Sequence, residues 1–161
     1  MIRELLNKVR MNHALEHATI ALLLKAEKIA PPLAGYSTPK GFFLYGKVAT
    51  EDVETASAEA LERLKAGESD LAVSYFCGTN ILVGGVLTAV ASALALGRRN
   101  RLQHLSSAVS ASTVALLAAP ALGRWLQKNV TTLANVESMA VERVNQPLGE
   151  SFHWVGTGFQ S

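Results

Sequence analysis

Two long uncharged stretches constrain the fold of this chain more than any other feature. No Asp, Glu, Lys or Arg occurs in residues 71–97, and after a short loop with three arginines the chain is uncharged again over residues 102–123. About twenty apolar residues cross a bilayer as a helix. The pattern therefore predicts two membrane spans, one over residues 81–96 with their flanks and one over residues 104–122. The alternative is a buried core hairpin within a larger assembly.

The composition agrees with a membrane protein that has a small extramembrane part. Of the 161 residues, 49% are hydrophobic and only 17% are charged, which is too apolar for an average soluble domain. Small residues such as Gly84, Ala93 and Ala115 occur along both predicted spans, and small side chains let two helices approach closely in lipid. We therefore expect a tight helical hairpin in the bilayer. The net charge of +2 is too small to suggest a nucleic-acid partner, and the single cysteine excludes an internal disulfide.

The residues outside the predicted hairpin are numerous enough for one modest hydrophobic core. We expect a small α/β (α+β) domain that the hairpin interrupts. Its N-terminal part would cover residues 1–76, the transmembrane hairpin residues 77–123, and its C-terminal part residues 124–161. Because the two ends of a helical hairpin lie close together, a domain accommodates such an insertion easily.

The N-terminal part is predicted to form a long helix followed by a β-α-β unit. A helix over residues 2–29 is expected, because two consecutive prolines follow it and prevent its continuation; a loop comes next. Aromatic and branched residues predict a strand over residues 42–48. An apolar stripe behind a Thr N-cap predicts a helix over residues 51–66. With a second strand over residues 71–76, this unit would contain two parallel strands joined by a right-handed crossover.

The C-terminal part is predicted to add a helix and a β-hairpin. Trp125 and the basic residues beside it predict an interfacial helix over residues 123–133. Residues 138–144 and 151–155 are separated by a segment with Pro and Gly, which predicts an antiparallel hairpin. This hairpin would extend the sheet begun by the β-α-β unit.

The candidate chemistry lies in the run Asn12-His13-Ala14-Leu15-Glu16-His17 of the predicted first helix. Residues four apart share one helix face, so both imidazoles can reach one ion while Glu16 stays within a water's distance of it. These ionisable groups interrupt the apolar stripe of the helix, and buried polar groups need partners. A metal would supply a common partner. The alternatives are an internal hydrogen-bond network in which Glu16 accepts from one imidazole, and histidines that ligate a haem or pigment.

The order His-x-x-Glu-His resembles the signature of the inverzincin zinc metallopeptidases. This resemblance implies that His13 and His17 are zinc ligands and that Glu16 is the general base that deprotonates a zinc-bound water. The third ligand of that family is a glutamate on a second helix, and here the corresponding stretch is the uncharged span. His153, at the end of a predicted strand, and Cys77, where another predicted strand ends, are therefore the candidate third ligands.

The whole chain also resembles an uncharacterised family of small bacterial membrane proteins with two spans. The resemblance depends on residues 12–17, on the run Cys77-Gly78-Thr79-Asn80 and on the two-span hairpin. It implies the architecture and brings no known activity. It adds Thr79 and Asn80 as residues that line the same site, where they could donate hydrogen bonds to a developing oxyanion. Alternatively, one of them caps the first span.

Two functional hypotheses follow from the sequence. In the first, a membrane-anchored protein holds zinc on His13 and His17, and Glu16 activates water for hydrolysis of a peptide or similar acyl substrate. In the second, the chain is a non-enzymatic subunit of a membrane complex, and its partners are other membrane-protein subunits or further copies of itself. The lipid bilayer is a partner in both.

The membrane orientation depends on two opposing features. Arg98, Arg99 and Arg101 crowd a short loop, which by the positive-inside tendency favours the cytoplasm for the hairpin tip. Translocating a folded N-terminal domain without a signal sequence would, however, be unusual. We therefore expect the extramembrane domain in the cytoplasm.

Overall fold

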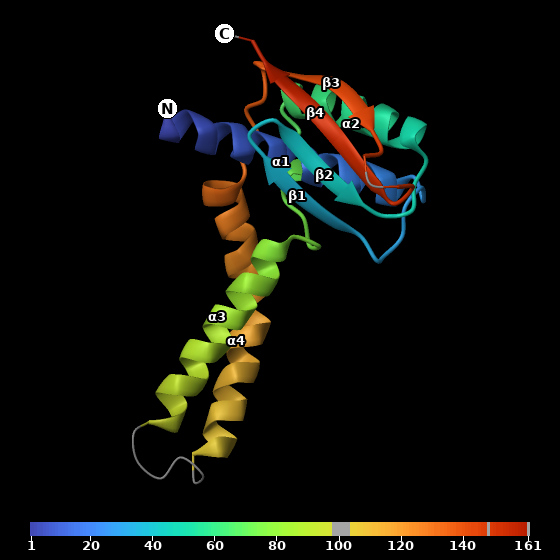
Figure 1. The fold of residues 1–161 in the computed structure, drawn as a ribbon. Helices are drawn as coiled ribbons and strands as arrows, with labels where there is room; N and C mark the ends of the chain where they lie inside the picture. Colours follow the sequence, from blue (N-terminus) through green and yellow to red (C-terminus); the bar gives the residue numbers. More distant parts are fainter. Residues whose placement is uncertain (98–103, 148, 161) are drawn as a thin grey trace. The chain divides into compact units, whose positions relative to one another are not determined.

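The computed structural model describes residues 1–97, 104–147 and 149–160 (Figure 1). The chain divides into two compact units. Met1–Ser74 and Lys128–Ser161 together form the first, called the α+β unit below, and Tyr75–Gln127 forms the second, called the hairpin unit. The loop arginines on which the predicted orientation depends lie outside the described residues.

The α+β unit begins with a long helix, α1 (Ile2–Lys25). Glu4 in its first turn and Lys25 in its last have the charges that favour the ends of the helix dipole. The helix ends four residues before the predicted position, because Glu27 adopts a left-handed conformation with φ 55°. The amide of Lys28 then bonds to the Leu23 carbonyl and that of Glu27 to the Leu24 carbonyl, which closes a Schellman motif before the prolines are reached.

Four strands follow in one antiparallel sheet of order β1-β2-β4-β3. They are β1 (Ala34–Thr38), β2 (Gly41–Tyr45), β3 (Met139–Asn145) and β4 (Phe152–Phe159). The C-terminal hairpin is present as predicted, and it joins the sheet because β4 pairs with β2. The tight turn from β1 to β2 uses Gly41, whose φ of 143° favours glycine. The α+β class is thus confirmed, with an all-antiparallel sheet.

The predicted parallel β-α-β unit is wrong in its second strand. Residues 71–76 form no strand; instead a 3-10 helix, η1 (Ser69–Ala72), follows the second helix. The amide of Leu71 bonds to the Glu68 carbonyl at 3.1 Å and that of Val73 to the Asp70 carbonyl at 3.2 Å. These backbone amides are used in local turns, so they cannot join a sheet ladder. The missed strand is β1, which the sequence analysis assigned to a loop.

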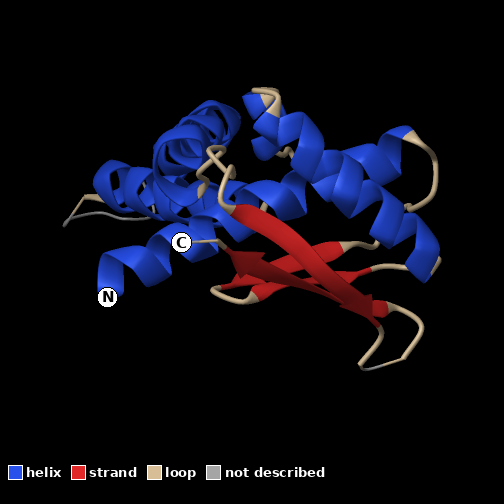
Figure 2. Ribbon diagram, turned by 90° about the horizontal axis from the view of Figure 1, so that it is seen from above, coloured by secondary structure: helices blue, strands red, loops and turns tan. Residues whose placement is uncertain are grey.

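Two helices cover one face of the sheet (Figure 2). These are α1 and α2 (Thr50–Lys65), the latter close to its predicted range. Alternation along β2 turns Phe42 and Leu44 toward the helices, where both are fully buried. Fully buried side chains of α1 and α2, including Leu15 and Val53, pack in the same core.

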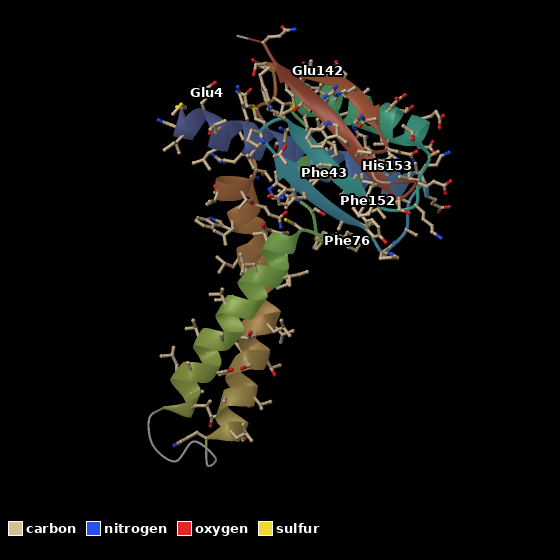
Figure 3. The ribbon with its side chains drawn as sticks, viewed as in Figure 1. Glu4, Phe43, Phe76, Glu142, Phe152 and His153 are labelled. Atoms are coloured by element: carbon tan, nitrogen blue, oxygen red, sulfur yellow. The ribbon has the colours of Figure 1, made fainter. Side chains whose placement is uncertain are left out.

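The opposite face of the sheet carries aromatic side chains, among them Phe43 and Phe152, which are labelled in Figure 3. The ring of Phe43 lies 4.5 Å from that of Trp154, and the ring of Tyr45 lies 4.9 Å from that of Phe152. Each pair joins neighbouring positions of β2 and β4. Such cross-strand aromatic pairs stabilise an antiparallel sheet.

The hairpin unit consists of two antiparallel helices. α3 (Gly78–Leu96) packs on α4 (Leu105–Leu126), which continues as a π-helix, η2 (Gln127–Thr131). The hydroxyls of Ser92 and Ser112 hydrogen-bond across the pair at 2.5 Å. A separate interfacial helix over residues 123–133 was predicted and is absent there, because α4 runs past Pro120 without a break and includes the start of that segment.

Both hairpin helices are long and apolar enough to cross a membrane. By length and composition the candidate spans are Gly78–Leu96, with mean hydropathy 1.8, and Leu105–Thr131, with mean hydropathy 1.6, and only 11% of each window is buried. Large apolar side chains such as Ile81, Leu94 and Leu117 are each more than three-quarters exposed. Membrane crossing itself stays a prediction.

Candidate metal site

The two motif histidines lie side by side on one face of α1. His13 and His17 are one helical turn apart, and their ring centroids are 4.3 Å from each other at an interplanar angle of 61°. The spacing follows directly from the helix, because residues four apart are neighbours on its surface. The sequence prediction that both imidazoles reach one point is therefore met by the geometry of α1.

His17 has an arrangement typical of a metal ligand. Its side chain is 2% exposed, and its Nδ1 lies 2.7 Å from the carbonyl oxygen of Ala72. A carbonyl can only accept, so Nδ1 carries the proton and Nε2 bears a lone pair. Within the described part of the chain, that buried Nε2 has no hydrogen-bond partner. A buried acceptor of this kind costs about 1–3 kcal/mol unless something binds it.

His13 is held in the same way by a different segment. Its Nδ1 lies 2.9 Å from the carbonyl oxygen of Thr131, in η2. The same reasoning assigns the proton to Nδ1 and a lone pair to Nε2. Histidines that ligate metals commonly donate their second ring N–H to a backbone carbonyl, which fixes the tautomer and the ring orientation. Both motif histidines follow this pattern.

Cys77 completes a group of three ligand-type side chains. His13, His17 and Cys77 each offer one ligand atom, these atoms lie within 4.8 Å of one another, and the group could hold a metal ion of unspecified identity. Cys77 is buried and is the N-cap of α3, where the amide of Thr79 donates to its sulfur at 3.4 Å.

Glu16 lies on the side of α1 that packs against β1. Its carboxylate is buried and accepts a hydrogen bond of 2.5 Å from the hydroxyl of Ser37. It also lies directly over Gly35, where a Cβ atom would overlap the carboxylate. Burial raises the pKa of Glu16, while the Ser37 hydrogen bond and, in its charged form, the His13 imidazole act in the opposite direction. Its predicted role as general base stays a prediction.

His153, the first candidate third ligand, lies in β4 opposite Leu44 of β2. It is fully buried, and its Nε2 is 2.9 Å from the amide nitrogen of Gln146. Burial lowers its pKa, because a charged imidazolium is poorly solvated there. His153 is outside the group of His13, His17 and Cys77. Of the two candidate third ligands, Cys77 is thus the one that lies with the two motif histidines.

Thr79 and Asn80 lie in the first turn of α3. The side-chain amide of Asn80 donates to the Tyr75 carbonyl at 3.0 Å and accepts from the Gln127 amide at 2.9 Å. Asn80 thus links the two ends of the hairpin unit. The N-cap of α3 is Cys77, one of the metal-site candidates, whereas the sequence favoured Thr79 or Asn80 for that position.

The sequence did not predict the hydrogen-bond partners of the motif residues. Asn12 is fully buried; its amide donates to the Thr38 carbonyl at 2.8 Å and accepts from the Thr157 hydroxyl at 2.8 Å. Its polarity next to an apolar stripe was a usable signal. The carbonyls that orient the two imidazoles belong to the backbone, and no side-chain pattern marks them.

Comparison of the sequence with known proteins shows the family of this chain. The family model described as "Domain of unknown function (DUF6391)" matches residues 8–144, a range that includes both motif histidines and Cys77. An uncharacterized protein of Picosynechococcus sp. (strain PCC 7002) is 36% identical over 160 residues, which cover 93% of this chain and 77% of that protein. No solved structure matches the chain. The sequence resemblance to an uncharacterised family is thereby confirmed, and this chain belongs to the DUF6391 family.

Proposed function

We propose that this chain is a membrane-anchored metal-binding protein that holds one zinc ion on His13 and His17. The observation that carries the proposal is His17, whose Nδ1–H is committed to the Ala72 carbonyl while its buried Nε2 has no partner among the described residues. An internal hydrogen-bond network, the alternative from the sequence, would be expected to supply a donor to that nitrogen. A metal ion needs the lone pair that is present there.

The donor types favour zinc over calcium and magnesium. Two imidazole nitrogens and one thiolate, with Cys77 as the third ligand, form a set that zinc binds in tetrahedral sites. Calcium and magnesium prefer oxygen ligands. Three protein ligands leave a fourth position for water, as in catalytic zinc sites.

Hydrolysis is the activity that such a site would support. A zinc ion held by His13 and His17 would supply activation of a water, and a neighbouring carboxylate would accept the proton of that water in hydrolysis of an acyl compound. Glu16 adjoins His17 on α1 and interacts electrostatically with His13, which supports it as that general base. The substrate class we propose is a peptide or similar acyl compound near the membrane surface.

The membrane anchor is the hairpin unit. Two spans are supported by the length and hydropathy of α3 and α4 and by the exposure of their large apolar side chains. Exposed apolar surface of this extent is unfavourable in water. Lipid is the solvent in which exposing these apolar side chains costs the least free energy.

Elemental analysis of the detergent-purified protein tests the metal proposal. We expect about one zinc per chain in the native protein and in Glu16→Gln, and a loss of zinc in His17→Ala. Cobalt substitution then tests Cys77, because a cobalt–thiolate bond gives an intense near-ultraviolet band that Cys77→Ser would abolish. If neither the native protein nor any variant contains metal, and the absorption spectrum does not change when cobalt is added, the proposal is refuted.

A second function is favoured by one observation. The Glu16 carboxylate is already engaged by Ser37 and packed over Gly35, as a structural side chain would be. In that case the chain is a non-enzymatic subunit of a membrane complex, and the histidines bind zinc structurally, ligate a haem or pigment, or hold a core network. Hydrolysis of a fluorogenic peptide mixture distinguishes the two, since a hydrolase loses turnover in Glu16→Gln while its zinc is retained.

A further inference from the structure

The two motif histidines hold the two segments that connect the α+β unit to the hairpin. His17 donates to the carbonyl of Ala72 in η1, which is two residues before the α+β unit gives way to the hairpin unit. His13 donates to the carbonyl of Thr131 in η2, shortly after the chain has returned. Residues 69–74 are called the leading segment below, and residues 128–133 the returning segment. One helical turn of α1 thus contacts both.

The two segments are held in different ways. The backbone of the leading segment forms local turns, in which the amides of Leu71 and Val73 bond to carbonyls three residues earlier, while Ala72 is buried in the core and Leu71 packs against it. The returning segment begins in a π-helix, a geometry that is rarely regular over more than one turn. It is further held by Arg10, whose guanidinium donates to the Asn129 and Thr132 carbonyls at 3.3 and 3.2 Å. The amide of Leu133 also bonds to the Arg10 carbonyl at 3.0 Å.

We infer that metal at His13 and His17 locks both connecting segments onto α1, so that metal occupancy sets how often these two segments open. This inference rests on the proposed metal site. A ring that is bound at Nε2 cannot turn about its side-chain torsions, and its Nδ1–H stays directed at the carbonyl. The hydrogen bond from each ring to its carbonyl contributes only about 1 kcal/mol net by itself. The metal therefore couples two segments that are far apart in the sequence.

The coupling has a size that follows from mass action. If opening of either segment releases the metal, then binding suppresses that opening by the factor 1 + [metal]/Kd. At free zinc 100 times the dissociation constant, the factor is about 100. Amides that exchange through this opening should slow about 100-fold, while amides that exchange through unrelated local motions should not change.

Hydrogen exchange by mass spectrometry on the full chain in detergent micelles tests the inference. Protein with buffered zinc is compared with protein in a zinc chelator. We expect chelation to speed exchange of the Leu71, Val73 and Leu133 amides together, by up to about 100-fold. Peptides from the middle of β2, which contacts neither segment through the histidines, should exchange at the same rate in both conditions.

His17→Asn separates the metal from the hydrogen bond. The Asn amide nitrogen takes the place of Nδ1 and can still donate to Ala72, but the variant lacks the ligand atom. We expect both segments of this variant to exchange at the chelator rate with or without zinc. Glu62→Gln, on the exposed side of α2 where Glu62 pairs with Lys65, is the matched control and should keep the full zinc response.

Two results would overturn the inference. One is zinc bound at one per chain with no change of exchange in either segment on chelation. The other is native protection of both segments in zinc-free His17→Asn, which would mean that the hydrogen bonds alone hold them. An absence of zinc by elemental analysis would instead refute the proposed function, so the two failures are distinguishable.

Discussion

Replacing Asn12 by Ala should be among the most damaging single changes in the α+β unit, although Asn12 contacts no candidate ligand atom. The side chain is fully buried and joins three elements, since α1 reaches the β1 residue Thr38 and the β4 residue Thr157 through it. The substitution removes two hydrogen bonds of 2.8 Å. It also leaves a part-buried carbonyl and a buried hydroxyl without these partners.

The magnitude can be worked out from those groups. Each net hydrogen bond contributes about 1 kcal/mol, and a buried group left unsatisfied costs about 1–3 kcal/mol. The Thr157 hydroxyl can rotate toward another acceptor, so we expect a loss of about 2–4 kcal/mol in the free energy of unfolding. For a chain of this length that corresponds to a fall in Tm of roughly 5–15 °C.

Thermal unfolding in detergent, followed by near-ultraviolet circular dichroism and by tryptophan fluorescence in a Trp125→Phe background, where Trp154 in β4 is the remaining tryptophan, measures the change. Thr19→Val is the matched control, because Thr19 is equally buried on α1 but its hydroxyl bonds only to the Leu15 carbonyl of its own helix. We expect that control to shift Tm by a few degrees at most. A loss below about 0.5 kcal/mol in Asn12→Ala, or an equal loss in Thr19→Val, would refute the reasoning.

Three further predictions concern the site and its surroundings. Gly35→Ala places a Cβ in the Glu16 carboxylate and should lower the stability by about 1–3 kcal/mol; an unchanged Tm would contradict the packing described here. Burial lowers the pKa of His153, so the unfolded chain takes up its proton first: the stabilisation is complete above about pH 6.5 and is lost as the pH falls through the depressed native value. Scans of Tm between pH 7.5 and 5 should show this decline, and His153→Gln should flatten it. Chelation should lower Tm in the native protein and leave Tm of His17→Asn unchanged. An equal response in both would show that His17 is not a metal ligand.

The parts of the fold that sequence predicted are those whose signals are local. α2 has acidic residues in its first turn, basic residues in its last and an apolar stripe between them, and the C-terminal hairpin is marked by a segment with Pro and Gly between two strand-like segments. β1 was missed because Ala34 and Gly35 have weak strand propensity, and the strand exists only through its register with β2. The parallel strand was predicted from apolar residues whose amides are used in turns, as at Leu71.

The candidate site divides in the same way. Spacing alone brought His13 and His17 together, because four residues make about one turn of any helix. Their partners could not be predicted, since the Ala72 and Thr131 carbonyls are 55 and 118 residues distant from the histidines that they orient. Every residue has a carbonyl, so the sequence contains no signal that singles out these two. The sequence could propose Glu16 as a base but could not identify its partner Ser37, which is 21 residues away in β1, a strand that was predicted to be a loop.

The motif in residues 12–17 therefore serves two faces of one helix. Asn12 and Glu16, four apart, point to the sheet, where they bond to β1 and β4, while His13 and His17, also four apart, point about 100° away, to the connecting segments. If the faces are independent, changes at Asn12 should lower the stability of the sheet without altering zinc stoichiometry, and changes at His17 should do the reverse. Glu16 is the residue that can break this separation, because it adjoins His17 on α1 and the charged form of His13 lowers its pKa. A loss of zinc affinity in Glu16→Gln would mean that the carboxylate acts on the metal site through its charge. A loss of stability alone would mean that the carboxylate serves only to hold β1 against α1.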